Sequence, residues 1–277
     1  MANHRLVFGI GAGFCYSLKD YKTDLPKLLN AFDNDILIST VDMPFTLARL
    51  IYDIVGQDRL YLDSGGFTLF KEQTKLGKDN PKFFKKCEKM KSKYLRLLSQ
   101  IKVKECFELD NDYFLKDSDL TSPKNFLRAE IKEITGFYPT PVFKMHQGFA
   151  YWKALCESKE YSKLAIGGLA QTRAWNTKTD EIRAMMDYAR LCGKKVHLLG
   201  CQNIQAFKEV QPSTVDYSIF QMAINLEFAK AEFLNTSDRR IIKETAVNYR
   251  DISHHITLWA VARAMSRCFL YDSYQKS

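Results

Sequence analysis

The strongest constraint on the fold of this chain is an alternation of short β-rich runs with longer helical patterns. We expect eight strands, at Leu6–Ile10, Asp35–Ile38, Leu60–Leu62, Cys106–Leu109, Val142–Lys144, Lys163–Ile166, Lys195–Leu199 and Thr214–Val215. Strands that alternate with helices form a parallel sheet covered by helices, and eight strands can close a (β/α)8 TIM-like barrel. We therefore predict an α/β barrel, with an open doubly wound sheet as the alternative that spacing alone leaves open.

The helical patterns set the expected domain organisation. Helices are expected around 46–55, 80–101, 123–135, 150–157, 178–192 and 203–209. After Tyr217 the pattern is helical to residue 277. We therefore divide the chain into a barrel over 1–220 and a C-terminal helical extension over 221–277 that packs on the barrel. No apolar run approaches the roughly 18 residues that a membrane span needs, so no membrane association is expected.

The cysteines and histidines argue against a metal site. The seven cysteines are widely spaced, and no two of them form a C-x-x-C pair. This pattern indicates neither a disulfide framework nor a zinc ribbon, and it is typical of reduced thiols in a cytoplasm. His254 and His255 are neighbours on a predicted helix, where adjacent side chains point in different directions. We expect no metal, no zinc subdomain, no cofactor and a cytoplasmic location.

Carboxylates, amides and glycines follow nearly every predicted strand. In chain order these positions are Asp63-Ser64-Gly65-Gly66, Asp110-Asn111-Asp112, His146-Gln147-Gly148, Gly167-Gly168, Leu199-Gly200 and Asp216. In a (β/α)8 barrel the catalytic groups stand at the C-terminal ends of the strands, so this pattern predicts a polar site in the barrel mouth. Asp-Ser-Gly-Gly is also a favourable turn, and a strand-end cap is the corresponding structural alternative for Asp216.

Positive charge is concentrated in one segment. Between Lys71 and Lys104 the chain carries twelve Lys or Arg and three acids, an excess equal to the net charge of +9 of the whole chain. Much of this segment is a predicted helix with Asn80 as its N-cap and Pro81 in its first turn. A solvated charged face is the simplest explanation, but the one-sided excess also favours binding of a polyanion. The lysines expected to contact nucleic acid are Lys82, Lys86, Lys89 and Lys93.

Four of the strand-end motifs resemble those of the tRNA-guanine transglycosylase superfamily, whose barrel enzymes exchange guanine for a 7-deazaguanine. The four are LDSGGF with Asp63, FELDND with Asp110, IGGLA with Gly167 and Gly168, and VDYS with Asp216. HQGF with Gln147 and HLLGC with Leu199 fit the family's intermediate motifs. The family's C-x-C-x-x-C zinc site is absent, and so is the Arg that usually follows the nucleophile motif. The chain is therefore most similar to the phage branch that modifies DNA, the DNA-guanine transglycosylases.

The resemblance implies a covalent mechanism and a binding site for the base. Asp216 would attack C1′ of the sugar, and Asp63 would be the general acid/base for the leaving and incoming bases. Asp110 would accept hydrogen bonds from the donor edge of guanine. The other predicted contacts are donors to guanine O6 (Gln147 and the backbone N–H of Gly168), a sandwich around the ring (Phe67 and Leu199), and turn residues that give the base room (Ser64, Gly65 and Gly167).

The function predicted on this basis is base exchange in nucleic acid, with DNA favoured, to insert a 7-deazaguanine such as 7-cyano-7-deazaguanine. The target nucleotide would be flipped or single-stranded, because its C1′ is buried in a stacked helix. A tRNA-guanine transglycosylase is the alternative enzyme, and a non-catalytic nucleic-acid-binding accessory barrel is the alternative outside catalysis. A phage-encoded enzyme would act in the host cell cytoplasm. The sequence leaves the deazaguanine used, the target sequence, the need for partner proteins and the oligomeric state open.

Overall fold

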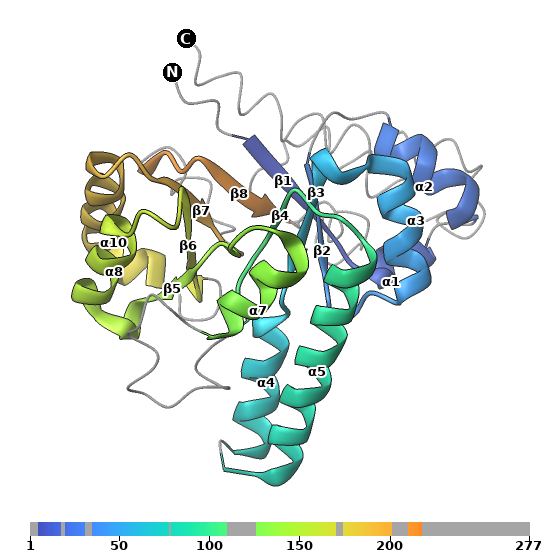
Figure 1. The fold of residues 1–277 in the computed structure, drawn as a ribbon, viewed down its shortest axis with the longest axis horizontal. Helices are drawn as coiled ribbons and strands as arrows, with labels where there is room; N and C mark the ends of the chain where they lie inside the picture. The colour runs from blue at the N-terminus through green and yellow to red at the C-terminus, as the bar shows by residue number, and fades with distance from the viewer. Residues whose placement is uncertain are drawn as a thin grey trace.

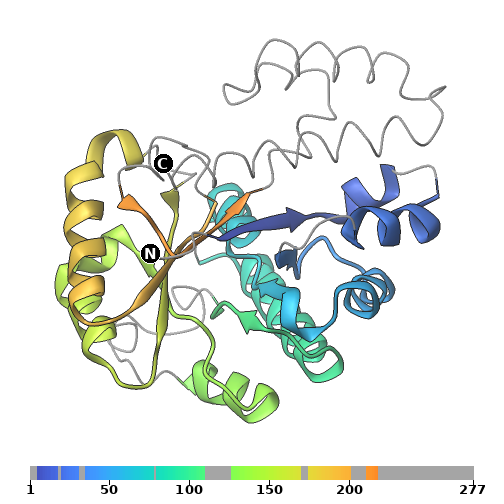
Figure 2. The same ribbon diagram turned by 90° about the horizontal axis from the view of Figure 1, so that it is seen from above.

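Eight parallel strands, interleaved with helices, form one sheet that curls into a half-barrel resembling a TIM barrel (Figures 1 and 2). The computed structural model describes residues 5–17, 20–30, 35–77, 79–109, 126–169, 174–200 and 210–217. The strands are β1 (Arg5–Ile10), β2 (Asp35–Ser39), β3 (Leu60–Asp63), β4 (Glu105–Cys106), β5 (Val142–Lys144), β6 (Lys163–Gly167), β7 (Lys195–Leu198) and β8 (Thr214–Tyr217). Their order in the sheet is β4-β3-β2-β1-β8-β7-β6-β5. The predicted α/β class is confirmed, and a strand lies at each of the eight predicted places, although β4 shares only Cys106 with the predicted run Cys106–Leu109.

The two ends of this strand order are joined only by contacts just after β4 and just before β5, and no strand pairing between β4 and β5 is present among the described residues. An isolated parallel bridge joins Phe107, just after β4, to Thr140, just before β5. The Thr140 carbonyl also accepts the N–H of Glu108 at 3.0 Å. The Glu108 carboxylate accepts the N–H of Val142 at 2.6 Å and forms a buried ion pair with Arg128. Burial of two charges is tolerated when they are paired and hydrogen-bonded, so this carboxylate fastens β4 to β5.

The helices that accompany the strands are α1 (Ala12–Ser17), α2 (Tyr21–Asn30), α3 (Phe45–Val55), α4 (Gly66–Leu76), α5 (Pro81–Gln100), α7 (Phe126–Thr135), α8 (Gly148–Glu157) and α10 (Ala174–Leu191), with short 3-10 turns at η1 (Gln57–Arg59) and η3 (Met145–Gln147). Five of the six predicted helices are confirmed as α3, α5, α7, α8 and α10. Helices α1, α2 and α4 were not predicted. The predicted helix at 203–209 and the extension over 221–277 lie outside the described residues.

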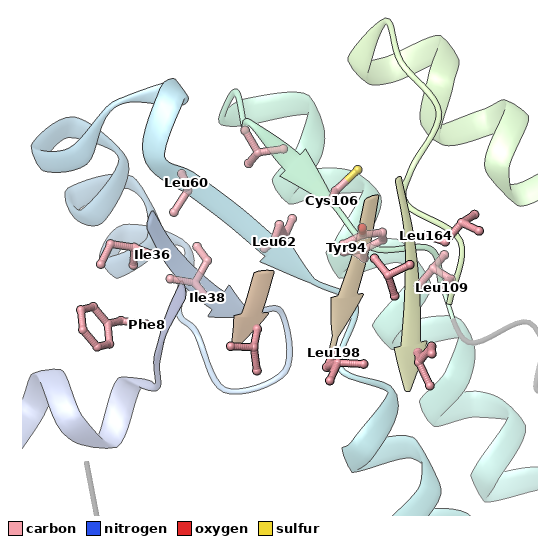
Figure 3. Close-up of a cluster of buried hydrophobic side chains, with 14 of the residues drawn as sticks. Phe8, Ile36, Ile38, Leu60, Leu62, Tyr94, Cys106, Leu109, Leu164 and Leu198 are labelled. Atoms are coloured by element: carbon pink, nitrogen blue, oxygen red, sulfur yellow. The ribbon is translucent and has the colours of Figure 1, made fainter. Parts of the chain in front are cut away.

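The two faces of the sheet bury different sets of side chains. Because successive residues of a strand point to opposite faces, each strand contributes to both sets. The outward set, with Phe8, Ile36 and Leu60 among its members, packs under the helices (Figure 3). The inner set forms a separate small cluster that fills the inside of the curl: Val7, Leu37, Tyr61, Phe107, Val142 and Ala165.

Helices α4 and α5 form an antiparallel hairpin between β3 and β4, which projects from the body of the protein (Figure 1). The Asn80 side chain accepts the N–H of Lys82 at 2.9 Å, and Pro81 occupies the first turn, as predicted. The inner half of α5 buries Tyr94 and Leu97 against the main core. The outer half packs on Leu69 of α4 in a core of its own. Helix α5 therefore belongs to both the sheet and the hairpin.

Candidate active site at the carboxyl ends of the strands

Asp63 and Asp216, the two predicted catalytic carboxylates, both project from the inner face of the curled sheet. Asp63 is the last residue of β3 and lies two residues after Tyr61, a member of the inner cluster. Asp216 pairs in register with Val7, another member of that cluster. Residues paired in register share a face, so both carboxylates face the inside near the carboxyl ends of their strands. Strands β2 and β1 lie between β3 and β8 in the sheet.

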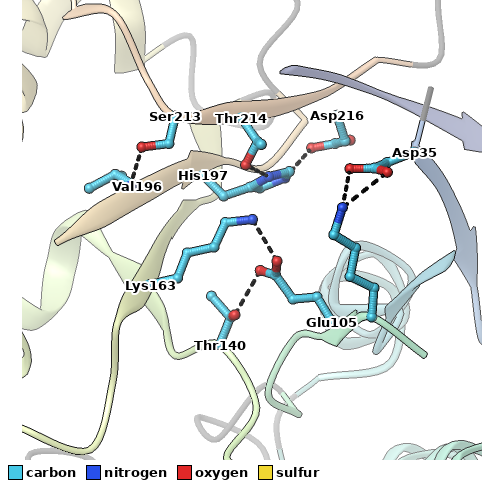
Figure 4. A network of polar contacts seen from close by, with 10 residues as sticks. Asp35, Glu105, Thr140, Lys163, Val196, His197, Ser213, Thr214 and Asp216 are labelled. Atoms are coloured by element: carbon cyan, nitrogen blue, oxygen red, sulfur yellow. Dashed lines mark hydrogen bonds and ion pairs between the residues drawn. The ribbon is translucent and has the colours of Figure 1, made fainter. Parts of the chain in front are cut away.

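The Asp216 carboxylate is held by two hydrogen bonds to one oxygen. Its Oδ1 accepts the backbone N–H of Gly200 at 2.6 Å and lies 3.3 Å from Nε2 of His197 (Figure 4). The Asp216 side chain is 15% exposed, so the carboxylate reaches solvent while its orientation is fixed. Both hydrogen bonds that described residues make to this carboxylate end on Oδ1, so we expect Oδ2 to be the oxygen that meets a ligand.

His197 is completely buried on β7 and contacts two side chains of β8. Its Nδ1 lies 2.8 Å from the hydroxyl oxygen of Thr214, and its Nε2 faces Asp216. Burial lowers the pKa of His197 below its ordinary value, although the hydrogen bond to Asp216 acts in the opposite direction. A neutral ring fits this environment if the Thr214 hydroxyl donates to Nδ1 and Nε2–H donates to Asp216. His197 therefore orients Asp216 without neutralising its charge.

His197 is the site residue that sequence reasoning missed. The motif HLLGC predicts a site role for Leu199 alone. His197 and Leu199 stand two residues apart, so they share a face if the strand continues through them. That spacing could have identified His197 from the sequence, because a residue two positions before a site residue on a strand also points inward.

Asp63 makes the turn that its local sequence favours. Its Oδ2 accepts the N–H of Gly65 at 3.1 Å, and its backbone carbonyl accepts the N–H of Thr40 at 3.0 Å. Gly65 adopts a φ of +91°, and a Cβ placed there would lie 2.2 Å from Cγ2 of Val41. The glycine is thus required for close packing of this turn against the loop after β2. Ser64 is buried beside it.

The predicted base-sandwiching residues come from opposite parts of the sheet. Phe67, in the first turn of α4, is 50% exposed, and the Lys71 ammonium lies 4.0 Å from the centre of its ring. Leu199 follows β7 and packs against the inner cluster. The strands that carry them, β3 and β7, are separated by β2, β1 and β8. Half of the Phe67 side chain is exposed to solvent, and Leu199 extends the apolar lining of the inside.

The remaining predicted base contacts lie at or just after the carboxyl ends of β5 and β6. Gln147 Oε1 accepts the N–H of Lys144 at 2.8 Å, which leaves the amide nitrogen as the group that can donate to a ligand. A Cβ on Gly167 would lie 2.7 Å from Val142, so this glycine permits tight packing of β6 on β5. A Cβ on Gly168 would meet nothing within 4 Å, which is open space at the carboxyl end of β6. Asp110 lies outside the described residues.

The four predicted nucleic-acid-binding lysines form one stripe on α5 but differ in their surroundings. Their spacing of four, three and four residues places them on one side of the helix. Lys86 forms an ion pair with Glu72 of α4, and the Lys93 ammonium donates to the Val41 carbonyl at 2.9 Å. Burial lowers the pKa of Lys93. Lys82 and Lys89 are exposed, and we expect these two to be the more available to a polyanion.

The Lys93 contact also fixes the position of the hairpin relative to the candidate site. Val41 lies two residues beyond the carboxyl end of β2, so Lys93 marks the level of the site on α5. Residues 81–92 precede this level along the helix. At about 1.5 Å per residue they extend about 18 Å beyond it, which makes the hairpin one wall above the carboxyl ends of the strands.

The opposite end of the inner face carries charges that are paired with one another. The Asp35 carboxylate lies 3.0 Å from the Lys104 ammonium, and the Glu105 carboxylate lies 2.5 Å from the Lys163 ammonium (Figure 4). Both ammonium groups also lie over the ring of Tyr61, at 5.6 and 4.9 Å from its centre. This network closes the amino end of the curl with charges of both signs.

Comparison with known proteins adds no relative: no protein-family model matches the chain, and no curated protein is significantly similar to it. Within the described ranges, no group of three or more His, Cys, Asp or Glu side chains could hold a metal ion. None of the helices that the structure describes is both long enough and apolar enough to cross a membrane.

Proposed function

We propose that this protein is a base-exchange glycosyltransferase that replaces guanine in nucleic acid with a 7-deazaguanine. The observation that carries the proposal is the pair of inward-facing carboxylates, Asp63 and Asp216, at the carboxyl ends of β3 and β8. Enzymes built on curled sheets of this kind have their catalytic groups at that end. Two carboxylates with different surroundings suit the two roles that the reaction needs, a nucleophile and an acid/base.

In the first displacement, Oδ2 of Asp216 attacks C1′ of the target nucleotide. The C1′–Oδ2 bond forms while the C1′–N9 bond breaks, and Asp63, as general acid, protonates the departing guanine. Asp216 has to be ionised and correctly oriented for this attack. The Gly200 N–H and the neutral His197 ring supply the orientation through Oδ1.

In the second displacement, the incoming deazaguanine takes the place of guanine. Asp63, now a carboxylate, removes the N9 proton, N9 attacks C1′, and the ester to Asp216 breaks. Two inversions restore the original configuration of the sugar, as in retaining glycosidases. The strand stays intact because the sugar is bound to the protein between the two steps.

The proposed base contacts follow from the resemblance. Asp110 accepts from the guanine donor edge, Gln147 and the Gly168 N–H donate to O6, and Phe67 and Leu199 enclose the ring. The exposed ring of Phe67 and the open space at Gly168 support these roles. A completely closed (β/α)8 barrel with a helical extension over 221–277 and no zinc subdomain is the finer fold that we propose.

DNA is the proposed polymer, because the C-x-C-x-x-C zinc motif of the tRNA-acting relatives is absent from the sequence. The test is exchange of radiolabelled guanine measured side by side on duplex DNA, single-stranded DNA and tRNA. Faster incorporation into either DNA supports the proposal. Faster turnover on tRNA favours the tRNA-acting alternative with the same chemistry, and nucleic-acid binding without incorporation into any polymer favours the accessory barrel.

A further inference from the structure

Exposed aromatic rings are concentrated on the α4–α5 hairpin. Phe67, Phe70 and Phe84 are 50%, 40% and 48% exposed, whereas the neighbouring Leu69 and Phe83 are buried between the helices. Phe67 lies closest to the candidate site, four residues after Asp63 in the chain. Phe70 and Phe84 have no role in the proposed chemistry. Large apolar side chains gathered on one exposed element indicate a surface that contacts another molecule.

The three rings lie on one side of the hairpin. On α5, Phe84 and Lys86 flank the buried Phe83 on opposite sides, because successive residues turn by about 100°. On α4, Phe70 and Glu72 flank the buried Leu69 in the same way. Lys86 and Glu72 form an ion pair, so they share one side of the hairpin, and Phe70 and Phe84 share the other.

Phe67 and two lysines complete this surface. Phe67 precedes Phe70 by three residues and therefore lies on the same face of α4. The Lys71 ammonium lies over the Phe67 ring, 4.0 Å from the ring centre, and Lys85, which follows Phe84 in the chain, is exposed. We call these five residues the aromatic side of the hairpin. This surface combines aromatic rings with positive charge, and it begins at Phe67, four residues after Asp63.

We propose that the aromatic side of the hairpin binds single-stranded nucleic acid, with unpaired bases stacked on its phenylalanines and phosphates near Lys71 and Lys85. This deepens the proposed function, on which the choice of a nucleic acid over other polyanions rests. Stacking on aromatic rings combined with a positive surface is how proteins hold single strands without reading their sequence. A duplex offers no free base faces, and base exchange needs an unstacked nucleotide.

Two other occupants fit the hairpin less well. Hairpins that enter membranes carry apolar residues where they insert, but the turn of this one is polar, with Gly77, Asp79 and Asn80. A second copy of the chain would bring an equally basic hairpin against this one, because the segment carries far more lysines than acids. Charge complementarity therefore favours an anionic strand.

The test is fluorescence anisotropy with the full-length protein and a fluorescein-labelled oligonucleotide, single-stranded or annealed to its complement. Wild type should bind the single strand more tightly than the duplex. The F70A/F84A variant should weaken single-strand binding about five- to 150-fold for each base that no longer stacks, with an unchanged salt slope. The K71Q/K85Q variant should flatten the salt slope by about 0.7 for each phosphate that is no longer neutralised.

The matched control is L191A, which removes an exposed apolar side chain at the carboxyl end of α10 and should bind like wild type. Normal single-strand binding by F70A/F84A, or tighter binding of duplex than single strand by wild type, overturns the proposal. Capture of wild type but not F70A/F84A by phosphatidylserine vesicles, with no oligonucleotide binding, overturns it in favour of a membrane.

The result separates this surface from the proposed chemistry. If F70A/F84A binds single strands normally while exchange proceeds in wild type, the proposed binding role of the aromatic side is wrong and the proposed transglycosylase activity is retained. If wild type exchanges no base but F70A/F84A loses single-strand binding, the binding role of the aromatic side is supported and the proposed base exchange is contradicted.

Discussion

The two ends of the curled sheet both carry charged side chains on the inner face, but they hold them in different ways. At the amino end Asp35 pairs with Lys104 and Glu105 pairs with Lys163. At the carboxyl end Asp216 is held by a backbone N–H and a neutral imidazole, and no Lys or Arg within the described residues forms an ion pair with it. A carboxylate that pairs with a lysine has its charge balanced within the fold. A carboxylate oriented by neutral donors keeps a charge that can interact with a ligand.

The largest expected effect comes from the carboxyl end. Asp216→Asn is nearly isosteric and should lower base exchange at least about a thousand-fold, because it removes the nucleophile. It should also abolish a protein–nucleic acid adduct that survives denaturation. Single-turnover exchange and a denaturing gel measure the two effects. Equal losses of exchange and of nucleic-acid binding would instead indicate a structural role for Asp216.

Substitutions at the amino end should lower the stability of the fold and should not act on the base-exchange reaction directly. Lys163→Met leaves the Glu105 carboxylate, whose side chain is 12% exposed, without its cation, and the loss should approach the cost of breaking a fully buried pair, about 3–5 kcal/mol. The free energy of unfolding is measured by urea denaturation. Lys195→Met is the matched control, because Lys195 pairs in register with Lys163 but is exposed, and it should change stability little. A normal urea midpoint for Lys163→Met would contradict the comparison.

His197 should make the carboxyl end sensitive to acid. Burial lowers its pKa in the folded protein below the ordinary value of 6.5, so below that pH the unfolded chain binds a proton that the folded protein does not. Stability contributed by the neutral ring is therefore present above pH 6.5 and is lost as the pH falls toward the folded pKa, by at most about 1.4 kcal/mol per pH unit.

Urea denaturation between pH 5 and pH 8 measures this dependence, with His197→Gln as the comparison. The glutamine amide can still donate to Asp216 but does not titrate. The variant should lose less stability on acidification than wild type. Equal losses would mean that His197 does not titrate differently in the two states.

The smallest expected effect concerns the lysine stripe. K82Q/K89Q removes two exposed lysines, and it should flatten the salt slope of single-strand binding by about 1.4 if both contact phosphates. K86Q/K93Q removes two lysines that already have partners in Glu72 and the Val41 carbonyl, and it should flatten the slope less. Oligonucleotide titrations at several salt concentrations compare the pairs. Equal slopes for the two variants would show that these internal contacts yield to nucleic acid.

The sequence was sufficient for the strands because buried parallel strands are continuous apolar runs bounded by glycine and polar residues. It placed Asp63 and Asp216 at strand ends for the same reason. Helix α4 was missed because Gly65 and Gly66 read as a turn, and its sequence FTLFKEQTKL has a short apolar face. The partners of Lys86 and Lys93 were beyond reach, since Glu72 and Val41 come near them only through tertiary packing.

His197 shows that prediction from sequence is limited in the same way within the candidate site. A strand with helices on one face and a packed interior on the other is buried on both, so its hydrophobic pattern does not separate inward from outward residues. Only the register with Thr214 on β8 puts the imidazole beside Asp216. The position of the carboxylate near a strand end could be predicted from a motif, but the group that orients it could not.

The continuity of α5 has a mechanical consequence. One unbroken helix runs from the tip of the hairpin at Pro81 to the core around Leu97, and Lys93 ties its middle to the loop after β2. The hairpin is thus anchored to the body of the protein at one end, and α5 contains no break that could act as a hinge. If the hairpin binds a nucleic-acid strand as proposed, the binding surface is already in place before the strand arrives, and no lid has to close over it.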